Sequence, residues 1–266
     1  MESIHSDMKT FSQMLDELGE EIAATDADIY DCPICRDTGW VSDGANAYPC
    51  SCRKKQQEQN RFALPPKLAK TNFSNFLLDK YSREIIPNRE ISYRNLAEKA
   101  LISAKDFASA YLSGGNPPGF ILIGPTGCGK THLVAATANS LLASGVDVLF
   151  LVVPEFLDQL RDSYRRESQG MSEGELIKRA YTAQVLVLDD LGAHNFTEWV
   201  QNKLFTIINY RLNHELPCLI TTNLDLDEMY SCIGRRTTSR LMEGCRKLFL
   251  ASKGDFRMQV DLEASR

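Results

Sequence analysis

The chain contains the octapeptide Gly124-Pro125-Thr126-Gly127-Cys128-Gly129-Lys130-Thr131, which matches the pattern G-x-x-x-x-G-K-[ST] at every position. The apolar run before it predicts a strand at 120–123, and the pattern after it predicts a helix at 130–142. The glycines allow backbone N–H groups to surround phosphates, and the positive end of the helix adds to the attraction. We expect Lys130 to contact the β- and γ-phosphates of ATP and Thr131 to ligate Mg²⁺. This context favours a phosphate-binding loop over a chance glycine-rich turn.

Acidic and amide side chains follow the next apolar runs. Asp189 and Asp190 end the run that begins at residue 185, where a buried strand would direct its terminal carboxylates toward the metal. We expect Asp189 to hold Mg²⁺ through water and Asp190 to act as the general base that orients the attacking water. Asn223 follows the run at 218–221 and is expected to position water at the γ-phosphate. The alternatives are solvated acids at a strand end and an ordinary turn asparagine.

Apolar runs alternate with helical patterns throughout the second half of the chain. Strands are predicted at 120–123, 146–153, 185–188, 218–221 and 247–251, and helices at 130–142, from 154 onward and at 197–212. Such alternation indicates an α/β fold with a parallel five-stranded sheet flanked by helices on both faces. Together with the octapeptide, it is typical of a P-loop NTPase. Helical periodicity at 91–112 precedes it, so we place the ATPase domain at 91–266 and a turn-rich linker at 70–90.

The segment 1–69 combines an amphipathic helical pattern at residues 8–22 with four clustered cysteines: Cys32, Cys35, Cys50 and Cys52. Four thiolates can close a tetrahedral Zn²⁺ site, and a closed site is structural rather than catalytic. Because a segment of about 25 residues lacks an adequate apolar core, the metal is expected to supply its folding energy. The second pair is C-x-C, so an iron–sulfur centre or a redox dithiol remains an alternative.

Composition excludes several classes of protein. With 43% hydrophobic and 24% charged residues among 266, the chain is neither wholly disordered nor fibrous. It has no apolar run of about eighteen residues and no signal-peptide pattern, so we expect no membrane contact and a cytoplasmic location. Of the net charge of −5, residues 1–31 carry −8, from nine acids and Lys9, which leaves +3 for the rest. A basic working surface is therefore allowed.

Together these features resemble the AAA+ ATPases and, within them, the DnaC/DnaI helicase loaders and their IstB relatives. Besides the octapeptide, the resemblance is carried by Leu-Val-Leu-Asp-Asp-Leu-Gly (186–192), Glu198-Trp199 leading to Ile-Ile-Asn-Tyr-Arg (207–211), and Thr-Thr-Asn (221–223). It covers roughly residues 70–260 and, less specifically, the cysteine module. Most AAA+ proteins carry Glu where this chain has Asp190, so slow hydrolysis is implied. Only 43 residues follow Asn223, too few for a separate C-terminal lid, which also resembles the loader group.

The resemblance also assigns roles to three arginines. Arg240, within the segment 235–241, is implied to be an arginine finger that reaches the γ-phosphate of a neighbouring subunit, which requires self-assembly through the ATP sites. Arg236 lies one helical turn before it. Arg257 lies where the loaders carry a sensor-2 arginine. For each of the three, the alternative is an ordinary surface charge.

The resemblance implies an ATP-dependent replicative helicase loader that acts in DNA replication. It would dock on a hexameric replicative helicase through residues 1–69 and bind single-stranded DNA. Two segments are candidates for DNA contact: 154–181, whose five bases and six acids sum to −1, and 232–248, with five bases against Glu243. The alternatives are an IstB-like transposition helper, an ATP switch that hydrolyses slowly, and a small-molecule kinase, for which we find neither a lid nor acceptor-binding residues.

Overall fold

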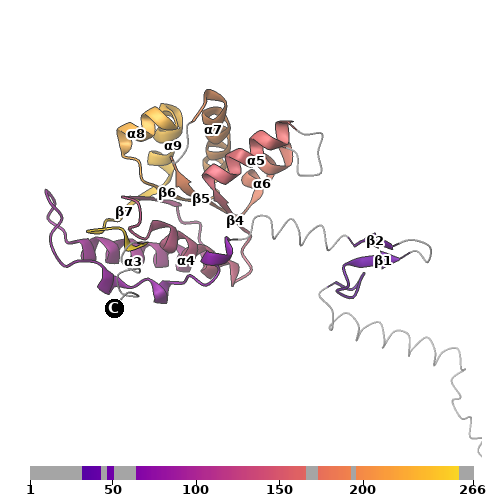
Figure 1. Ribbon diagram of the computed structural model, residues 1–266, viewed down its shortest axis with the longest axis horizontal. Coiled ribbons are helices and arrows are strands. Elements are labelled where there is room, and N and C mark those ends of the chain that lie inside the picture. Colours follow the sequence, from indigo (N-terminus) through magenta and orange to yellow (C-terminus); the bar gives the residue numbers. More distant parts are fainter. Residues whose placement is uncertain (1–31, 43–46, 51–63, 166–172, 193–195, 258–266) are drawn as a thin grey trace, which may run out of the picture. The chain divides into compact units, whose positions relative to one another are not determined.

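The structure is a computed structural model that describes residues 32–42, 47–50, 64–165, 173–192 and 196–257 (Figure 1). The chain divides into two compact units, Met1–Phe62 and Ala63–Arg266. The helix expected at 8–22 lies outside the described residues. Within the described ranges, no helix is both long enough and apolar enough to cross a lipid bilayer.

In the first unit, the described residues form a cysteine knuckle followed by a small antiparallel hairpin. Its strands are β1 (Trp40–Ser42) and β2 (Ala47–Pro49), with Trp40 opposite Pro49. The Cys50 N–H donates to the carbonyl oxygen of Gly39 at 2.9 Å and thereby continues the pairing beyond β2. In this part of the chain, Val41 is the apolar side chain that packs against the cysteines.

A five-stranded parallel sheet forms the centre of the second unit. Its strands are β3 (Phe120–Ile123), β4 (Val148–Val152), β5 (Val185–Leu191), β6 (Cys218–Thr222) and β7 (Arg246–Phe249). Their order is β4-β5-β6-β3-β7, and every neighbouring pair is parallel. The carboxyl ends of β3, β6 and β5 therefore lie side by side, which gathers the loops that follow these three strands. The predicted α/β fold with a five-stranded parallel sheet is confirmed.

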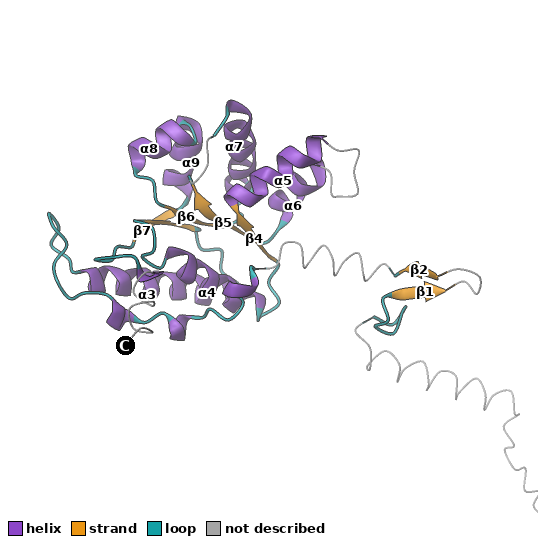
Figure 2. Ribbon diagram, in the orientation of Figure 1, coloured by secondary structure: helices purple, strands orange, loops and turns teal. Residues whose placement is uncertain are grey.

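Helices cover both faces of this sheet (Figure 2). Two of them, α3 and α4, lie on one face, and α5 to α9 lie on the other. Their bounds are α3 (Tyr93–Leu112), α4 (Lys130–Leu142), α5 (Val153–Arg165), α6 (Glu173–Thr182), α7 (Glu198–Asn213), α8 (Leu226–Cys232) and α9 (Arg235–Gly244). Of the predicted starts at 91, 130 and 197, α4 begins at the predicted residue, α3 two residues later and α7 one residue later, because local signals fix their first turns. The Ser92 side chain accepts from Asn95 N–H before α3, Thr197 accepts from Val200 N–H before α7, and the phosphate loop leads directly into α4.

The alternation of side chains along β5 decides which face its first aspartate occupies. Val185 and Val187 belong to the core cluster formed with α3 and α4. Because successive side chains of a strand point to opposite faces, Asp189 falls on that same face, toward α4. The strand thus delivers one carboxylate to the helix that follows the phosphate loop.

The segment before α3, for which the sequence suggested a linker at 70–90, packs on the second unit. Phe76 and Tyr81 are buried in its core, and the Tyr81 hydroxyl donates to the Cys128 carbonyl oxygen at 2.7 Å. Asn139 of α4 donates to the carbonyl oxygens of Leu68 and Thr71 at 2.9 and 2.8 Å. The aromatic side chains explain the difference. Burial of their large apolar surface stabilises the segment against the core, although its turns prevent a long helix or strand. The boundary of the compact unit consequently lies at Ala63.

Arg211 on α7 is a fully buried arginine that binds backbone carbonyl groups. Its guanidinium donates to the carbonyl oxygens of Ala180, Tyr181, Ala183, Gln184 and Pro217 at 2.8–3.3 Å. These carbonyls belong to the end of α6 and to the residues that lead into β5 and β6. One side chain therefore joins three segments of the chain.

Candidate functional sites

The phosphate loop connects β3 to α4, and two of its glycines adopt a conformation that other residues resist. Gly127 has φ +72° and Gly129 has φ +99°, both in the left-handed region. Gly124 is required for a different reason, because a Cβ there would come within 1.8 Å of the Leu250 carbonyl oxygen. Cys128 is buried, and its thiol donates to that same oxygen at 3.4 Å. The loop is thus wedged against the residue that follows β7.

Lys130 opens α4 with its side chain folded back over the loop. Its ammonium group donates to the carbonyl oxygens of Gly124 at 2.7 Å and Pro125 at 2.8 Å. The residue is only 8% exposed, and this burial lowers the pKa of the ammonium group, while Asp189 and Asp190 act in the opposite direction. A partly desolvated cation held over the loop is suited to binding phosphate oxygens.

Asp189 and Thr131, the two predicted magnesium ligands, lie in contact. The Asp189 carboxylate accepts from the Thr131 hydroxyl at 3.0 Å and from the Thr221 hydroxyl at 2.6 Å. Burial raises the pKa of Asp189, and the two hydroxyl donors counteract the rise. A carboxylate and a hydroxyl beside a phosphate loop are the hard oxygen donors that Mg²⁺ prefers. The residues present therefore fit the ion.

Asp190 and Asn223 are exposed at the carboxyl ends of neighbouring strands β5 and β6. Asp190 has φ +61°, which is unusual for a residue other than glycine, and its N–H donates to the Thr221 hydroxyl at 2.9 Å. The structure brings both residues to the sheet edge that carries the phosphate loop. Their side chains are open to solvent there.

The C-terminal described residues cover the phosphate loop. The Phe256 N–H donates to the Gly127 carbonyl oxygen at 3.2 Å, and the Phe256 ring meets the Tyr81 ring edge-on at 4.9 Å. Asp255 lies so close that a Cβ on Gly127 would be 1.9 Å from its carboxylate. Arg257 is near enough to Lys130 for its charge to lower the pKa of that lysine. This places Arg257 beside the loop, and its role as a sensor of nucleotide stays a prediction.

Arg240 and Arg236 lie on α9, and within the described residues neither forms a hydrogen bond or ion pair with the phosphate loop. Arg240 donates to Glu243 at 3.4 Å and lines a cavity of about 350 Å³ together with Gly119 and Pro217. Those two residues precede β3 and β6, so Arg240 lies at the sheet edge opposite its own phosphate loop. Arg236 is exposed in the first turn of α9. Any action of Arg240 on a γ-phosphate would have to be on the site of another subunit.

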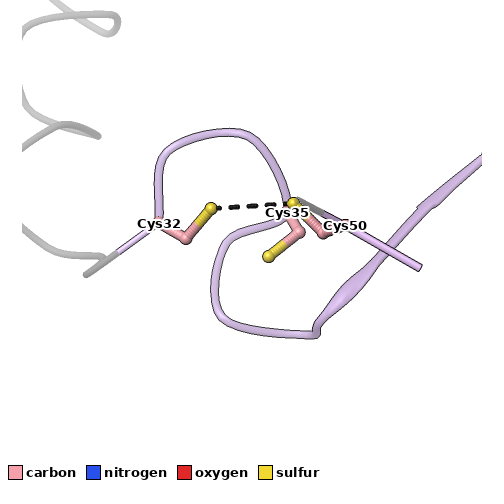
Figure 3. Close-up of side chains that lie close together, drawn as sticks. All are labelled: Cys32, Cys35 and Cys50. Carbon is pink, nitrogen blue, oxygen red and sulfur yellow. Dashed lines mark hydrogen bonds between the residues drawn. The ribbon is translucent and has the colours of Figure 1, made fainter. Parts of the chain in front are cut away.

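Three of the four predicted zinc ligands converge in the first unit (Figure 3). The sulfur atoms of Cys32, Cys35 and Cys50 all lie within 4.8 Å of one another, and those of Cys32 and Cys50 are 3.8 Å apart. A tetrahedral site with Zn–S bonds of about 2.3 Å requires sulfur atoms about 3.8 Å apart. The Gly39 N–H donates to the Cys35 sulfur at 3.3 Å, as backbone amides do toward ligating thiolates. Cys52 lies outside the described residues.

Sequence reasoning missed Thr221, Asp255 and Tyr81. The signal for Thr221 was present, because two hydroxyl residues end a buried strand directly before Asn223. The contacts of Asp255 and Tyr81 with the phosphate loop join residues far apart in the chain and left no local pattern to find.

The sheet order, the phosphate loop and the adjacent carboxylate define an AAA+ ATPase fold with a nucleotide site at the carboxyl ends of its strands. The family model described as "IstB-like ATP binding protein" matches residues 105–246, more than half of the chain, and the protein belongs to this family. The predicted membership of the AAA+ group that includes the DnaC/DnaI loaders is confirmed.

Several relatives carry names that bear on function. The chain is 34% identical over 156 residues to the replicative helicase loader DnaI of Bacillus subtilis, a match that covers 55% of this chain and 48% of DnaI. It is 28% identical over 161 residues to the replicative helicase loader DnaC of Escherichia coli, covering 60% of this chain and 64% of DnaC. The chain thus matches less than two thirds of the length of either loader.

Two further likenesses extend the comparison. The phage-like element PBSX protein XkdC of Bacillus subtilis is 26% identical over 268 residues, which covers 92% of this chain and 94% of XkdC. A crystal structure of DnaI superposes with a TM-score of 0.56 at 25% identity, covering 73% of this chain and 94% of that structure.

Proposed function

We propose that the chain binds ATP with Mg²⁺ and hydrolyses it slowly. In this proposal the octapeptide cradles the phosphates, and Lys130 contacts the β- and γ-phosphates. Thr131 and Asp189 hold the magnesium ion, which neutralises charge on the phosphates. Asp190 orients the attacking water with the help of Asn223, and the short reach of an aspartate makes this step slow. The contact between Thr131 and Asp189 beside the buried lysine supports this assignment.

A neighbouring subunit would complete the site. Arg240 cannot serve its own phosphate loop, because it lies at the opposite edge of the sheet. We therefore assign it to the neighbour's γ-phosphate, with Arg236 as the other candidate on the same helix. Arg257, already beside the loop, would sense the nucleotide within its own subunit.

The cysteine unit would be a structural zinc site made by Cys32, Cys35, Cys50 and Cys52. The 3.8 Å sulfur separation supports a tetrahedral metal of this size. A closed site offers no open position for chemistry, so its part in function is to fold a surface for a partner.

We propose further that the protein is a loader of a hexameric replicative helicase and acts in DNA replication. The observation that carries this proposal is the similarity of its ATPase unit to DnaI and DnaC, two proteins named replicative helicase loaders. The cysteine unit, compact by itself, is the candidate for docking on the helicase. ATP hydrolysis would then release the helicase on single-stranded DNA.

A pull-down with the replicative helicase of the same cell tests the loader proposal. The tagged full-length protein should retain the helicase when ATP is present, and replacement of Cys32 and Cys35 by Ser should abolish retention. The Cys232→Ser variant, which alters a thiol outside the cluster, is the matched control. Equal retention by all three proteins, or by none, would contradict docking through the cysteine unit.

Single-stranded DNA would be the second partner, contacted by residues 154–181 or 232–248. In the described part of the first segment, Arg161 pairs with Asp158, and Arg179 forms an ion pair with Asp147. In the second, Arg235 lies over the ring of Tyr230 and Arg246 is exposed. Arg246→Ala and Arg161→Ala, compared in a DNA-binding titration at several salt concentrations, would show which segment makes phosphate contacts.

The second candidate function is a transposition helper, which the match to the IstB-like family model favours. The two functions differ in the partner that the ATP-bound protein would bind. A helper would be retained by a transposase on double-stranded DNA, whereas a loader is retained by a hexameric helicase. The same pull-down with each partner distinguishes them.

A further inference from the structure

The two strands that carry the acidic residues lose their register at the site itself. β5 and β6 pair from Leu188 with Ile220 and again from Leu191 with Thr222. Between these pairs β5 contains one residue more than β6, which makes a β-bulge. The bulged residues are Asp189 and Asp190, and Asp190 takes the left-handed conformation with φ +61°. The bulge therefore interrupts the backbone hydrogen bonds between β5 and β6 at the two residues whose carboxylates would serve the nucleotide site.

The Thr221 hydroxyl fills the interruption. It accepts a hydrogen bond from the Asp190 backbone N–H at 2.9 Å and donates its proton to the Asp189 carboxylate at 2.6 Å. Thr221 is 1% exposed, so water does not take over either bond. The Asp189 oxygen that accepts this proton also accepts from Thr131, which links β6, β5 and α4 in one chain of hydrogen bonds.

We propose that Thr221 is a positioning residue of the ATP site, and this proposal rests on the proposed ATPase function. Its hydroxyl replaces the backbone bond that the bulge removes and so fixes both aspartates at once. Asp189 is held toward Thr131, where the magnesium ion would bind, and Asp190 is held with its side chain open to solvent. Thr221 touches neither nucleotide nor water in this proposal and acts through its two neighbours.

A hydroxyl suits this pair of bonds because it is a strong donor and a strong acceptor in one atom. Valine has almost the same shape and offers neither. Thr221→Val would leave the Asp190 N–H and one Asp189 lone pair without partners inside the protein, and the bulge would be free to shift. Small displacements of catalytic groups reduce turnover more than they reduce ground-state binding.

The experiment compares Thr221→Val and Thr221→Ser with the full-length wild type. For Thr221→Val we expect ATP turnover to fall about tenfold or more, with affinity for a fluorescent ATP analogue little changed. The Mg²⁺ concentration that half-saturates analogue binding should rise about tenfold, as for loss of an outer-shell partner. Thr221→Ser keeps the hydroxyl and should restore both values.

Thr222→Val is the matched control. Its buried hydroxyl also makes two bonds, donating to the Leu191 carbonyl oxygen at 2.6 Å and accepting from the Leu224 N–H at 3.1 Å. Loss of these bonds should lower the thermal midpoint about as much as Thr221→Val does, while the Mg²⁺ requirement stays that of the wild type. An equal Mg²⁺ requirement in the two Val variants would overturn the proposal, and so would a Ser variant that behaves like Val.

The Mg²⁺ titration separates this proposal from the proposed function. If the wild type binds the analogue but does not turn over ATP, the proposed hydrolysis is wrong. The positioning role of Thr221 is then tested by the Mg²⁺ requirement of the variants alone. If Thr221→Val does not fold, Thr221→Cys replaces it, because a thiol is a weaker donor and acceptor. Its Mg²⁺ requirement must then lie above that of the wild type, and a wild-type value would overturn the proposal.

Discussion

The phosphate loop and the cysteine cluster are held in place in opposite ways. The loop lies on a parallel sheet, with buried side chains of α3, α4, β3 and β6 behind it. In the described part of the first unit, the buried residues are the cysteines themselves, with Val41 packed against them. In the second unit the packed core positions the site, whereas in the first unit a bound metal would have to supply the folding free energy. The two should therefore respond differently to loss of their central residues.

The largest expected effect is loss of metal from the cysteine unit. Cys32→Ser combined with Cys35→Ser should remove about 10 kcal/mol of metal-derived folding free energy and unfold residues 32–50. Metal analysis should show one zinc per wild-type chain and none in the variant, and limited proteolysis should cut only the variant in this region. ATP binding should persist, because the ATPase core contains none of these side chains.

The control is Cys232→Ser, in the second unit, which should keep its zinc. A full equivalent of zinc in the double variant would refute the assignment of the ligands. If the double variant lost ATP binding together with zinc, the nucleotide site would depend on the cysteine unit and the two units would not be independent.

The next effect concerns Arg240, which would act on the nucleotide site of a neighbouring subunit. Arg240→Ala should bind ATP almost normally, but its turnover should fall about a thousandfold, because an arginine finger acts in the transition state. Mixing it with Lys130→Ala protein should restore activity, since mixed interfaces join an intact phosphate loop to an intact arginine. Turnover is measured across a titration of the two variants with DNA present.

Arg235→Ala removes an exposed charge from the same helix and serves as the control. Arg236→Ala, mixed in the same way, asks whether the other candidate contributes. Mixtures that give only the weighted average of the two inactive proteins, with cross-linking to prove assembly, would show that Arg240 has no role in trans.

A smaller effect is expected in nucleotide affinity. Lys130→Ala should weaken binding of an ATP analogue roughly a hundredfold, or about 3 kcal/mol, because charge-assisted bonds to the phosphates are lost. A fluorescence titration measures it, with Lys105→Ala on the exposed side of α3 as the control. Zinc content should stay at one per chain. Unchanged affinity in Lys130→Ala would remove the basis for the phosphate-loop assignment.

The smallest predicted effect lies in the packing behind the loop. Tyr81→Phe removes the bond to the Cys128 carbonyl oxygen and should lower the free energy of unfolding of the ATPase unit by about 1–2 kcal/mol. Urea unfolding measures this difference. The control is Tyr111→Phe, whose hydroxyl makes no hydrogen bond within the described part of the chain. Equal stability of the two variants would mean that the segment before α3 does not support the loop.

The sequence predicted most of the sheet and the loop because their signals are local. Continuous apolar runs located the strands, and the octapeptide located the start of α4 at Lys130. The two hydroxyl residues before Asn223 were visible in the sequence, but the bond from Asp190 to Thr221 was not, because it depends on a bulge that exists only after β5 and β6 have paired. Asp255 was missed because its contact with Gly127 spans 128 positions in the chain. Turn-rich spacing around Phe76 and Tyr81 suggested a linker, although their aromatic character was the sign of burial.

The buried guanidinium of Arg211 has a consequence for the time course of folding. The guanidinium can be desolvated only when carbonyl groups at the end of α6 and directly before β5 and β6 are all in place to accept its hydrogen bonds. We expect these contacts to form after the transition state, in which case they slow unfolding without speeding folding. We expect Arg211→Met to raise the unfolding rate constant and to leave the folding rate constant unchanged. In a chevron plot, the slopes of both limbs should stay the same and only the unfolding limb should move upward. The arginine would act as a latch, and the lifetime of the folded ATPase unit would depend on it more than the rate of its formation.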